Sequence, residues 1–249
     1  MSILSSLEFS DSTIRLKRAE IGRRLIELSP RISRTGLAAL TTVDLELLFQ
    51  LYDEIFFERR LSNSFQGNLR FSLSSRMTKS AGKTIYPKYP AKIEPSQLTA
   101  EIRIGTDFFL HYNDLTGLKM VSGIITHNAL EALQLVFEHE LCHLIEFISF
   151  NSSNCKKRRF KTLARRLFGH TESYHKLPTP AQIAWQKYGF KPGDPAGFIY
   201  EGQLLQGIIY RIQKRAIIIV KDPQGIYRDR QGTRYTKYYI PLKQLIRRN

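Results

Sequence analysis

The chain of 249 residues is long enough for one large domain or for a domain with a small additional module. Its 42% hydrophobic residues supply a core, its two cysteines exclude a disulfide scaffold, and it has no uncharged run long enough to span a membrane. Lys and Arg outnumber Asp and Glu by 38 to 22, which predicts a polyanionic partner, most simply nucleic acid, rather than a membrane surface. A solvated basic surface without a partner is the alternative. The low cysteine content and the lack of a signal peptide predict a cytoplasmic protein, associated with the nucleoid if DNA is the partner.

The first 65 residues contain two helical patterns. Residues 1–40 show apolar residues at helical spacing, broken at Pro30, and predict a helical N-terminal extension. Thr41 and Asp44 have the spacing of a capping box ahead of an apolar stripe, so a helix is expected from about 43 to 60.

Strands and two further helices are expected in the central part. The stretches NLRFSLS (68–74) and AEIRIGT (100–106) are strand-like, with SAGKTIYP (80–87) as a third. Residues 127–149 form the longest helical pattern, free of Gly and Pro. RFKTLARRLFG (159–169) predicts a helix that ends at Gly169.

A change in composition predicts a second domain. Residues 176–197 are rich in Pro and Gly and predict a linker, so the domain boundary is expected near 190–200. The first domain therefore covers 41–190 and the second 200–249. Short β-branched runs and the turn Asp222-Pro-Gln-Gly225 predict a small all-β barrel, of an SH3-like type, for the second domain.

The second domain has the composition of a nucleic-acid-binding module. From Gly202 onward there are 11 Lys and Arg, two Asp and Glu, and five tyrosines. Cations suit phosphates and aromatic rings suit bases. The candidate binding residues are Arg211, Lys214, Arg215, Lys237 and Tyr238. A packing or protein-binding module with a basic face is the alternative.

The stretch FEHELCHLIEF (137–147) predicts a metal site. On a helix, residues four apart lie on one face, so His139 and His143 can bind one ion, for which zinc is suited. Glu140, one residue from His139, is placed to act as a general base on a water at the metal. The alternative is a buried helix whose two histidines are ordinary core residues with hydrogen-bond partners. The apolar neighbours disfavour it, because burying two imidazoles without partners costs free energy.

A catalytic zinc site needs a third protein ligand, for which four residues are candidates. Cys155 precedes the next helix, and the adjacent lysines and arginines favour its thiolate. His170 and His175 follow that helix, and an ordinary surface or capping role is favoured for His175. Glu146 reaches the same ion poorly and is better placed to orient a ligand histidine.

Residues 45–176 resemble the SprT-like metalloproteases, the group that includes Spartan. The resemblance rests on LYDEIFF, SSRMTKSAGKT (74–84), HELCH and RFKTLARRLFGH. It implies a minimal zincin-like α+β domain in which His139 and His143 bind Zn²⁺ and Glu140 is the catalytic base. The chain departs from the family at the third ligand, since Lys156 occupies the position of the usual histidine; Cys155, one residue away, is ranked first and His170 second.

The family resemblance and the basic C-terminal module together predict a function. We expect a zinc-dependent endopeptidase that acts on DNA-associated or DNA-crosslinked proteins, with DNA and the proteins bound to it as partners. The alternative is a nucleic-acid-binding protein whose zinc is purely structural, held by four ligands such as His139, His143, Cys155 and His170. A protein-interaction adaptor is a third interpretation, which the unbalanced C-terminal charge disfavours.

Overall fold

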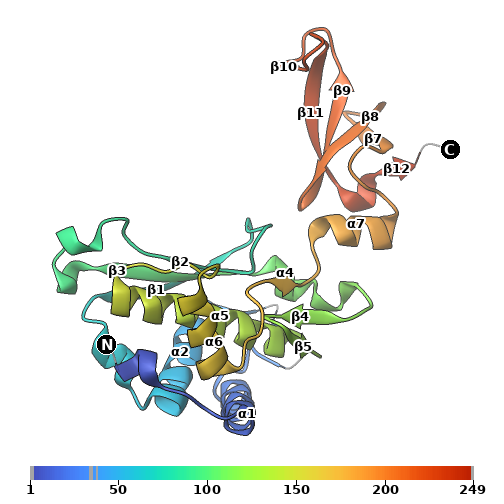
Figure 1. Ribbon diagram of the computed structural model, residues 1–249. Coiled ribbons are helices and arrows are strands. Elements are labelled where there is room, and N and C mark those ends of the chain that lie inside the picture. The colour runs from blue at the N-terminus through green and yellow to red at the C-terminus, as the bar shows by residue number, and fades with distance from the viewer. Residues whose placement is uncertain (1–2, 34–35, 38, 248–249) are drawn as a thin grey trace. The chain divides into compact units, whose positions relative to one another are not determined.

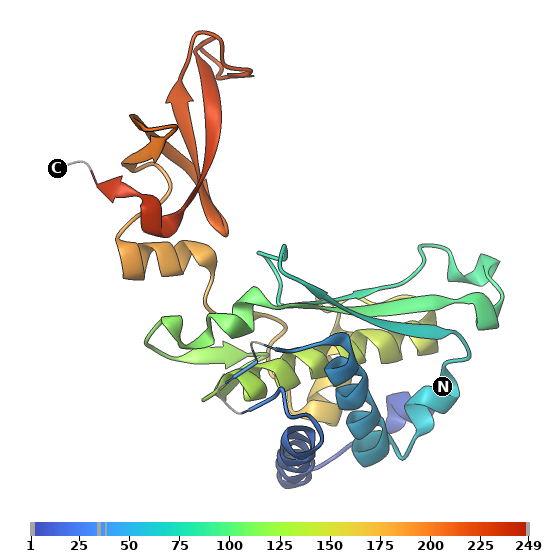
Figure 2. The ribbon, with the colours of Figure 1, turned by 180° about the vertical axis from the view of Figure 1, so that it is seen from behind.

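The N-terminal part of the chain forms a three-stranded sheet with helices on one face (Figure 1, Figure 2). The computed structural model describes residues 3–33, 36–37 and 39–247. The sheet contains β1 (Asn68–Ser74), β2 (Gly82–Ile85) and β3 (Thr99–Gly105), in the order β1-β3-β2. Strand β1 runs parallel to β3 and β2 runs antiparallel to it, so β2 is an edge strand. The three strands predicted from sequence are confirmed.

The helices bury one continuous apolar core against this sheet. They are α1 (Asp11–Leu28), α2 (Thr42–Phe57), α5 (Ala129–Phe150) and α6 (Arg158–Phe168), with the short α3 (Arg60–Ser64) and α4 (Asp107–Leu110). The helices predicted at 43–60, 127–149 and 159–169 are confirmed as α2, α5 and α6. Helix α2 ends before 60 because Glu58 and Arg59 adopt left-handed conformations, with φ of 51° and 63°.

Helix α1, which lies in the segment expected to be a helical N-terminal extension, is part of this core. Its residues Ile14, Ile21 and Leu25 are buried in the same cluster as the apolar residues of α5. The chain divides into two units between Leu177 and Pro178, and α1 lies in the N-terminal unit.

A second, small sheet lies in the N-terminal unit and is not expected from the sequence. It contains β4 (Lys119–Val121), β5 (Ile124–Thr126) and β6 (His175–Lys176), in the order β5-β4-β6. Val121 pairs with His175, and the Ser122 amide donates to the Tyr174 carbonyl at 3.0 Å. These bonds fix the segment that follows α6.

The C-terminal unit is an open sheet. Its strands are β7 (Pro195–Tyr200), β8 (Gln203–Ile212), β9 (Arg215–Lys221), β10 (Tyr227–Arg228), β11 (Arg234–Pro241) and β12 (Ile246–Arg247). They lie in the order β10-β11-β9-β8-β7-β12. The expected all-β character is confirmed, but the two short edge strands do not pair with each other in the part of the chain that the structure describes. No closed barrel is found there.

The segment interpreted as a linker contains a helix, α7 (Pro180–Tyr188), that belongs to the C-terminal unit. Thr179 and Gln182 form a capping box, Pro180 occupies the first turn, and Gly189 (φ 70°) ends the helix. The linker interpretation was wrong here because Pro and Gly mark helix boundaries as well as loops. Ala184 of α7 packs in the same core as Phe198 and Ile209 of the sheet. Among the described residues, no helix has the length and apolar character needed to cross a membrane.

Candidate metal centre

Helix α5 carries the candidate site and is buried along most of its length. Asn128 caps it, accepting a bond from the Glu131 amide at 2.9 Å, and Glu131 bonds back to the His127 amide. A helix that is apolar on all sides is stable only inside a protein, and α5 lies between the sheet and the helices α1 and α6. The histidines of HELCH therefore sit in the interior, on a rigid support.

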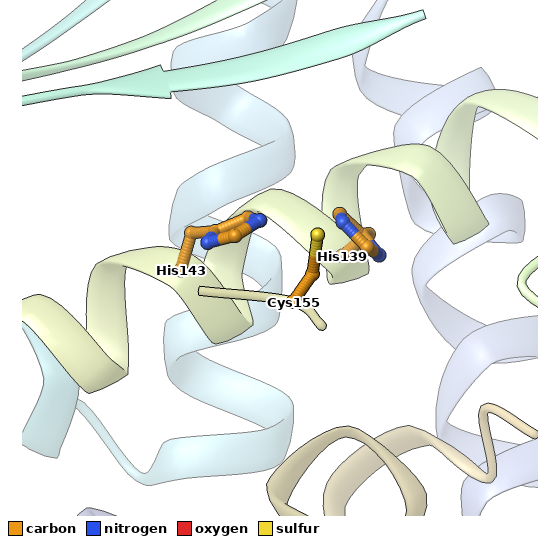
Figure 3. Close-up of side chains that lie close together, drawn as sticks. All are labelled: His139, His143 and Cys155. Atoms are coloured by element: carbon orange, nitrogen blue, oxygen red, sulfur yellow. The ribbon is translucent and has the colours of Figure 1, made fainter. Parts of the chain in front are cut away.

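The structure brings His139, His143 and Cys155 together (Figure 3). One ligating atom from each lies within 4.8 Å of the other two. A tetrahedral zinc ion places nitrogen and sulfur ligands roughly 3.3–3.6 Å apart, so a small closing movement would suit such an ion. Two imidazoles and one thiolate are a donor set that zinc accepts, and three protein ligands leave one coordination position open.

The protonation states of these groups fit metal binding. Burial, with a smaller contribution from neighbouring histidines, lowers the pKa of His139 to about 2, and burial lowers the pKa of His143 to about 4. Both rings are therefore neutral, the form that binds metals. The His139 Nδ1 is buried without a hydrogen-bond partner. Burial raises the pKa of Cys155 more than Lys156 lowers it, so the thiol keeps its proton until a cation replaces it.

A chain of hydrogen bonds orients His143. Its Nδ1 lies 2.7 Å from Ser153 Oγ, which donates to Glu146 Oε2 at 2.7 Å. Arg159 Nε donates to the other Glu146 oxygen at 2.6 Å. This arrangement keeps the His143 proton on Nδ1 and leaves Nε2 free as a ligand. Glu146 thus acts on His143 through Ser153, a residue that sequence reasoning did not single out.

The Glu140 carboxylate is fixed against the edge of the sheet. Thr84 Oγ1 of β2 donates to Glu140 Oε2 at 2.8 Å. A Cβ on Gly82 would lie 2.6 Å from Glu140 Oε1, so only glycine leaves room for this carboxylate. Burial raises the pKa of Glu140 to about 7, against the opposing effect of the Thr84 hydrogen bonds.

Two further rings line the site. Phe160 packs on both imidazoles, with ring centroids 4.9 Å from His139 and 4.5 Å from His143. His175 packs edge-on against His139 with the centroids 5.3 Å apart, and its Nδ1 is buried without a partner. The surface role favoured for His175 therefore does not describe its position. Only the pairing of β6 with β4 places it there, and no local pattern in the sequence marks it.

His170 lies in a different network from the three candidate ligands. Its Nε2 is 2.9 Å from Glu138 Oε2, and Glu138 also accepts bonds from Arg18 and Tyr52. All four side chains are buried or nearly so. Burial would raise the pKa of Glu138, but Arg18 and His170 outweigh it and lower that pKa. The network joins α1, α2 and α5 one residue before His139.

The candidate nucleic-acid-binding residues lie in the C-terminal unit and do not all share one environment. Lys237 lies over the rings of Tyr227 and Tyr210. Arg211 follows a bulge in β8 and Arg215 begins β9, while Lys214 lies in the turn between them. Tyr238 packs against Phe198 in the core, with centroids 5.1 Å apart, so its ring faces inward.

Comparison with known proteins identifies the N-terminal unit. A family model described as the SprT-like family matches residues 45–179. No curated protein and no solved structure matches the chain. The match covers more than half of the sequence, contains His139, Glu140, His143 and Cys155, and leaves out α1 and the C-terminal sheet. It suggests a metallopeptidase-like domain and confirms the resemblance: the chain belongs to the SprT-like family.

Proposed function

We propose that this protein is a zinc-dependent endopeptidase that acts on DNA-associated or DNA-crosslinked proteins. The observation that carries the proposal is the set formed by His139, His143 and Cys155 with the Glu140 carboxylate on the same helix. His139, His143 and Cys155 would hold the ion. Bound zinc would supply Lewis-acid polarisation of a peptide carbonyl and a lowered pKa of water at the metal.

Glu140 would carry out the proton transfers. Thr84 holds its Oε2, which leaves Oε1 to take a proton from the attacking water and pass it to the leaving amine. A pKa raised to about 7 by burial suits a group that must both accept and donate a proton near neutral pH.

The edge strand β2 supports a polypeptide substrate. Among the described residues, β2 pairs only with β3, so the backbone groups on its other side have no strand partner. An extended peptide can add to such an edge by main-chain hydrogen bonds, without selecting a particular sequence. Thr84 places this edge directly beside Glu140.

Two basic surfaces support DNA as the partner. The C-terminal unit has 13 Lys and Arg between 178 and 249 against four Asp and Glu. In the N-terminal unit, exposed cations follow Cys155 and continue on α6: Lys156, Lys157, Arg158, Lys161 and Arg165. Binding to DNA would raise the local concentration of proteins bound to the same DNA, so the peptidase site need not be sequence-selective.

Cleavage of casein and histones by the zinc-loaded protein, with and without DNA, tests the proposal. Glu140→Gln should retain its zinc and lower kcat by about 10²–10⁴-fold, since general acid–base catalysis contributes that much. The matched control is Glu54→Gln, on the exposed face of α2, which should cleave like the wild type. DNA should accelerate the wild type on histones.

The peptidase proposal would be contradicted if neither the wild type nor Glu140→Gln cleaved any substrate while both bound zinc. The metal would then be structural, and nucleic-acid binding would be the remaining function.

A further inference from the structure

The two faces of the C-terminal sheet differ. One face packs on α7 and buries Phe198, Ile209 and Ile218. Because side chains alternate along a strand, the neighbours of these residues point to the opposite, outer face. Among residues 178–247, none covers that outer face with a second apolar layer, and it keeps large side chains exposed: Ile199, Leu204, Ile208, Tyr210, Tyr239 and Ile246.

Tyrosines gather around one lysine on this outer face. Lys237 Nζ lies 3.5 Å from the ring centroid of Tyr227 and 5.3 Å from that of Tyr210. Tyr239, two residues from Lys237 on β11, shares its face. Tyr210 is 59% exposed and Tyr239 54%. The rings hold the ammonium group at the surface and leave aromatic area open to a ligand.

A groove of about 590 Å³ lies on the same sheet, and its lining residue Ile219 pairs with Lys237. It is lined mainly by aliphatic side chains of β7, β8, β9 and β12, among them Leu204, Ile208, Ile219 and Ile246. Tyr235 and the cation Lys221 also line it, and Arg247 reaches its edge while its guanidinium donates to the Gly189 carbonyl. The groove therefore offers an apolar floor with positive charge beside it.

No carboxylate belongs to the strands of this sheet. The four acidic residues of the unit lie in the turns or before β7, and Asp222 and Asp229 accept hydrogen bonds there from turn amides. Asp229 also accepts a bond from the Tyr235 hydroxyl at 2.9 Å, at the end of the groove. The outer face therefore combines apolar and aromatic surface with an excess of positive charge. Such a face repels a second copy of itself, which argues against self-association through the sheet.

We infer that the outer face of the C-terminal sheet binds single-stranded DNA, with bases on Tyr210, Tyr227 and Tyr239 and in the aliphatic groove, and phosphates on Lys237 and Lys221. Aromatic rings and an apolar floor match the faces of unpaired bases, which a duplex keeps stacked. Gln206 is the only side-chain amide in the lining of the groove, which offers little to the 2′-hydroxyl of RNA. The inference rests on the proposed function only in taking DNA as the partner. It adds that the DNA is single-stranded and that the outer face of the sheet binds it.

The test uses the full chain with Glu140→Gln, so that binding is measured without cleavage. Fluorescence anisotropy would compare a labelled oligo-dT, a DNA hairpin duplex and an oligo-U of equal length. We expect oligo-dT to bind most tightly. Tyr210→Ala and Tyr239→Ala should each weaken binding by about 5- to 150-fold, the range for loss of one stacked base, while Tyr210→Phe should bind like the parent. Lys237→Gln should reduce the slope of log affinity against log salt by about 0.7.

The matched control is Tyr200→Ala. Tyr200 is also exposed, but it contacts Tyr238 on the inner face, so its loss should leave binding unchanged. An unchanged Trp185 fluorescence spectrum would confirm that each variant is folded. Equal binding of duplex or oligo-U, or equal losses from Tyr200→Ala and Tyr239→Ala, would overturn the inference. Cleavage of casein without DNA is measured separately on the wild type, so failure of the binding face and failure of the peptidase can be told apart.

Discussion

The two units place their polar and apolar residues in opposite ways. The buried polar and charged side chains of the described chain, including Glu138, His139, Glu140 and Glu146, all lie in the N-terminal unit. More than half of the exposed large hydrophobic residues lie in the C-terminal unit, which is less than a third of the chain. Buried polar groups need partners in fixed positions and so produce defined chemistry, whereas exposed apolar area is available for binding.

The largest effect that tests this difference is expected from Arg18→Ala. Arg18 donates two bonds of 2.7 Å to Glu138, and its loss leaves a buried carboxylate without its cation. We expect the free energy of unfolding of the N-terminal unit to fall by about 3–5 kcal/mol. Far-UV circular dichroism in urea would follow the helices, and the fluorescence of Trp185, the single tryptophan, would follow the C-terminal unit.

Only the unfolding transition followed by circular dichroism should shift to lower urea concentration. The control Arg23→Ala removes an exposed arginine that pairs with Glu20 and Glu27, and should leave the free energy of unfolding nearly unchanged. A similar loss for both variants would show that burial of the Arg18–Glu138 pair has no special importance.

Removal of the candidate thiolate ligand comes next in size. Cys155→Ala should lower zinc affinity by more than about 100-fold, since even groups that only orient a ligand contribute 10- to 100-fold. Competition with a chromogenic chelator would measure this. Cys142→Ala is the control, because Cys142 is buried and is not among the grouped ligands. Cobalt-loaded protein should lose its thiolate charge-transfer absorption in Cys155→Ala alone; its persistence there would exclude Cys155 as a ligand.

A smaller effect is expected from Ser153→Ala. This change breaks the link between His143 and Glu146 without touching the metal, and should lower zinc affinity by about 10- to 100-fold. Ser152, the exposed neighbour, supplies the control Ser152→Ala, which should bind zinc like the wild type. If both variants bind equally well, the hydrogen-bond chain does not orient His143.

The smallest effect concerns Asp44 at the start of α2. Burial would raise its pKa, but hydrogen bonds from Arg31, Ser29 and Thr41 outweigh it and lower the pKa to about 2. A lowered pKa stabilises the fold above the ordinary value of 3.8, and this contribution is lost as pH falls through about 2. Asp44→Asn should therefore cost about 1–2 kcal/mol at pH 7 and almost nothing near pH 2.

Urea unfolding followed by circular dichroism at both pH values would measure this difference. Asp222→Asn, in an exposed turn of the other unit, should leave the N-terminal transition unchanged at either pH. If Asp44→Asn lowered the free energy of unfolding equally at both pH values, the lowered pKa of Asp44 would be refuted as the cause.

The sequence predicted those features that depend on local spacing. Helix α5 was predictable because its pattern runs through 22 residues, and the positions of His139, Glu140 and His143 on it follow from helical geometry. The contacts made by Arg18, Ser153 and His175 join segments distant in sequence or depend on loop geometry, so no periodicity marks them. The open C-terminal sheet was mistaken for a barrel because strand patterns do not show whether the edge strands meet.

The segment between α5 and α6 has a consequence for the lifetime of the protein. Two residues of this connection, Ser153 and Cys155, lie against the histidines or Glu146, as do Arg159 and Phe160 in the first turn of α6. An ion shared by His143 and Cys155 would close a short loop and hold this connection against α5. Loss of the ion would loosen this connection at Lys156 and Lys157, residues of the kind that trypsin-like proteases cut. Metal supply would then set how long each molecule survives before it is degraded.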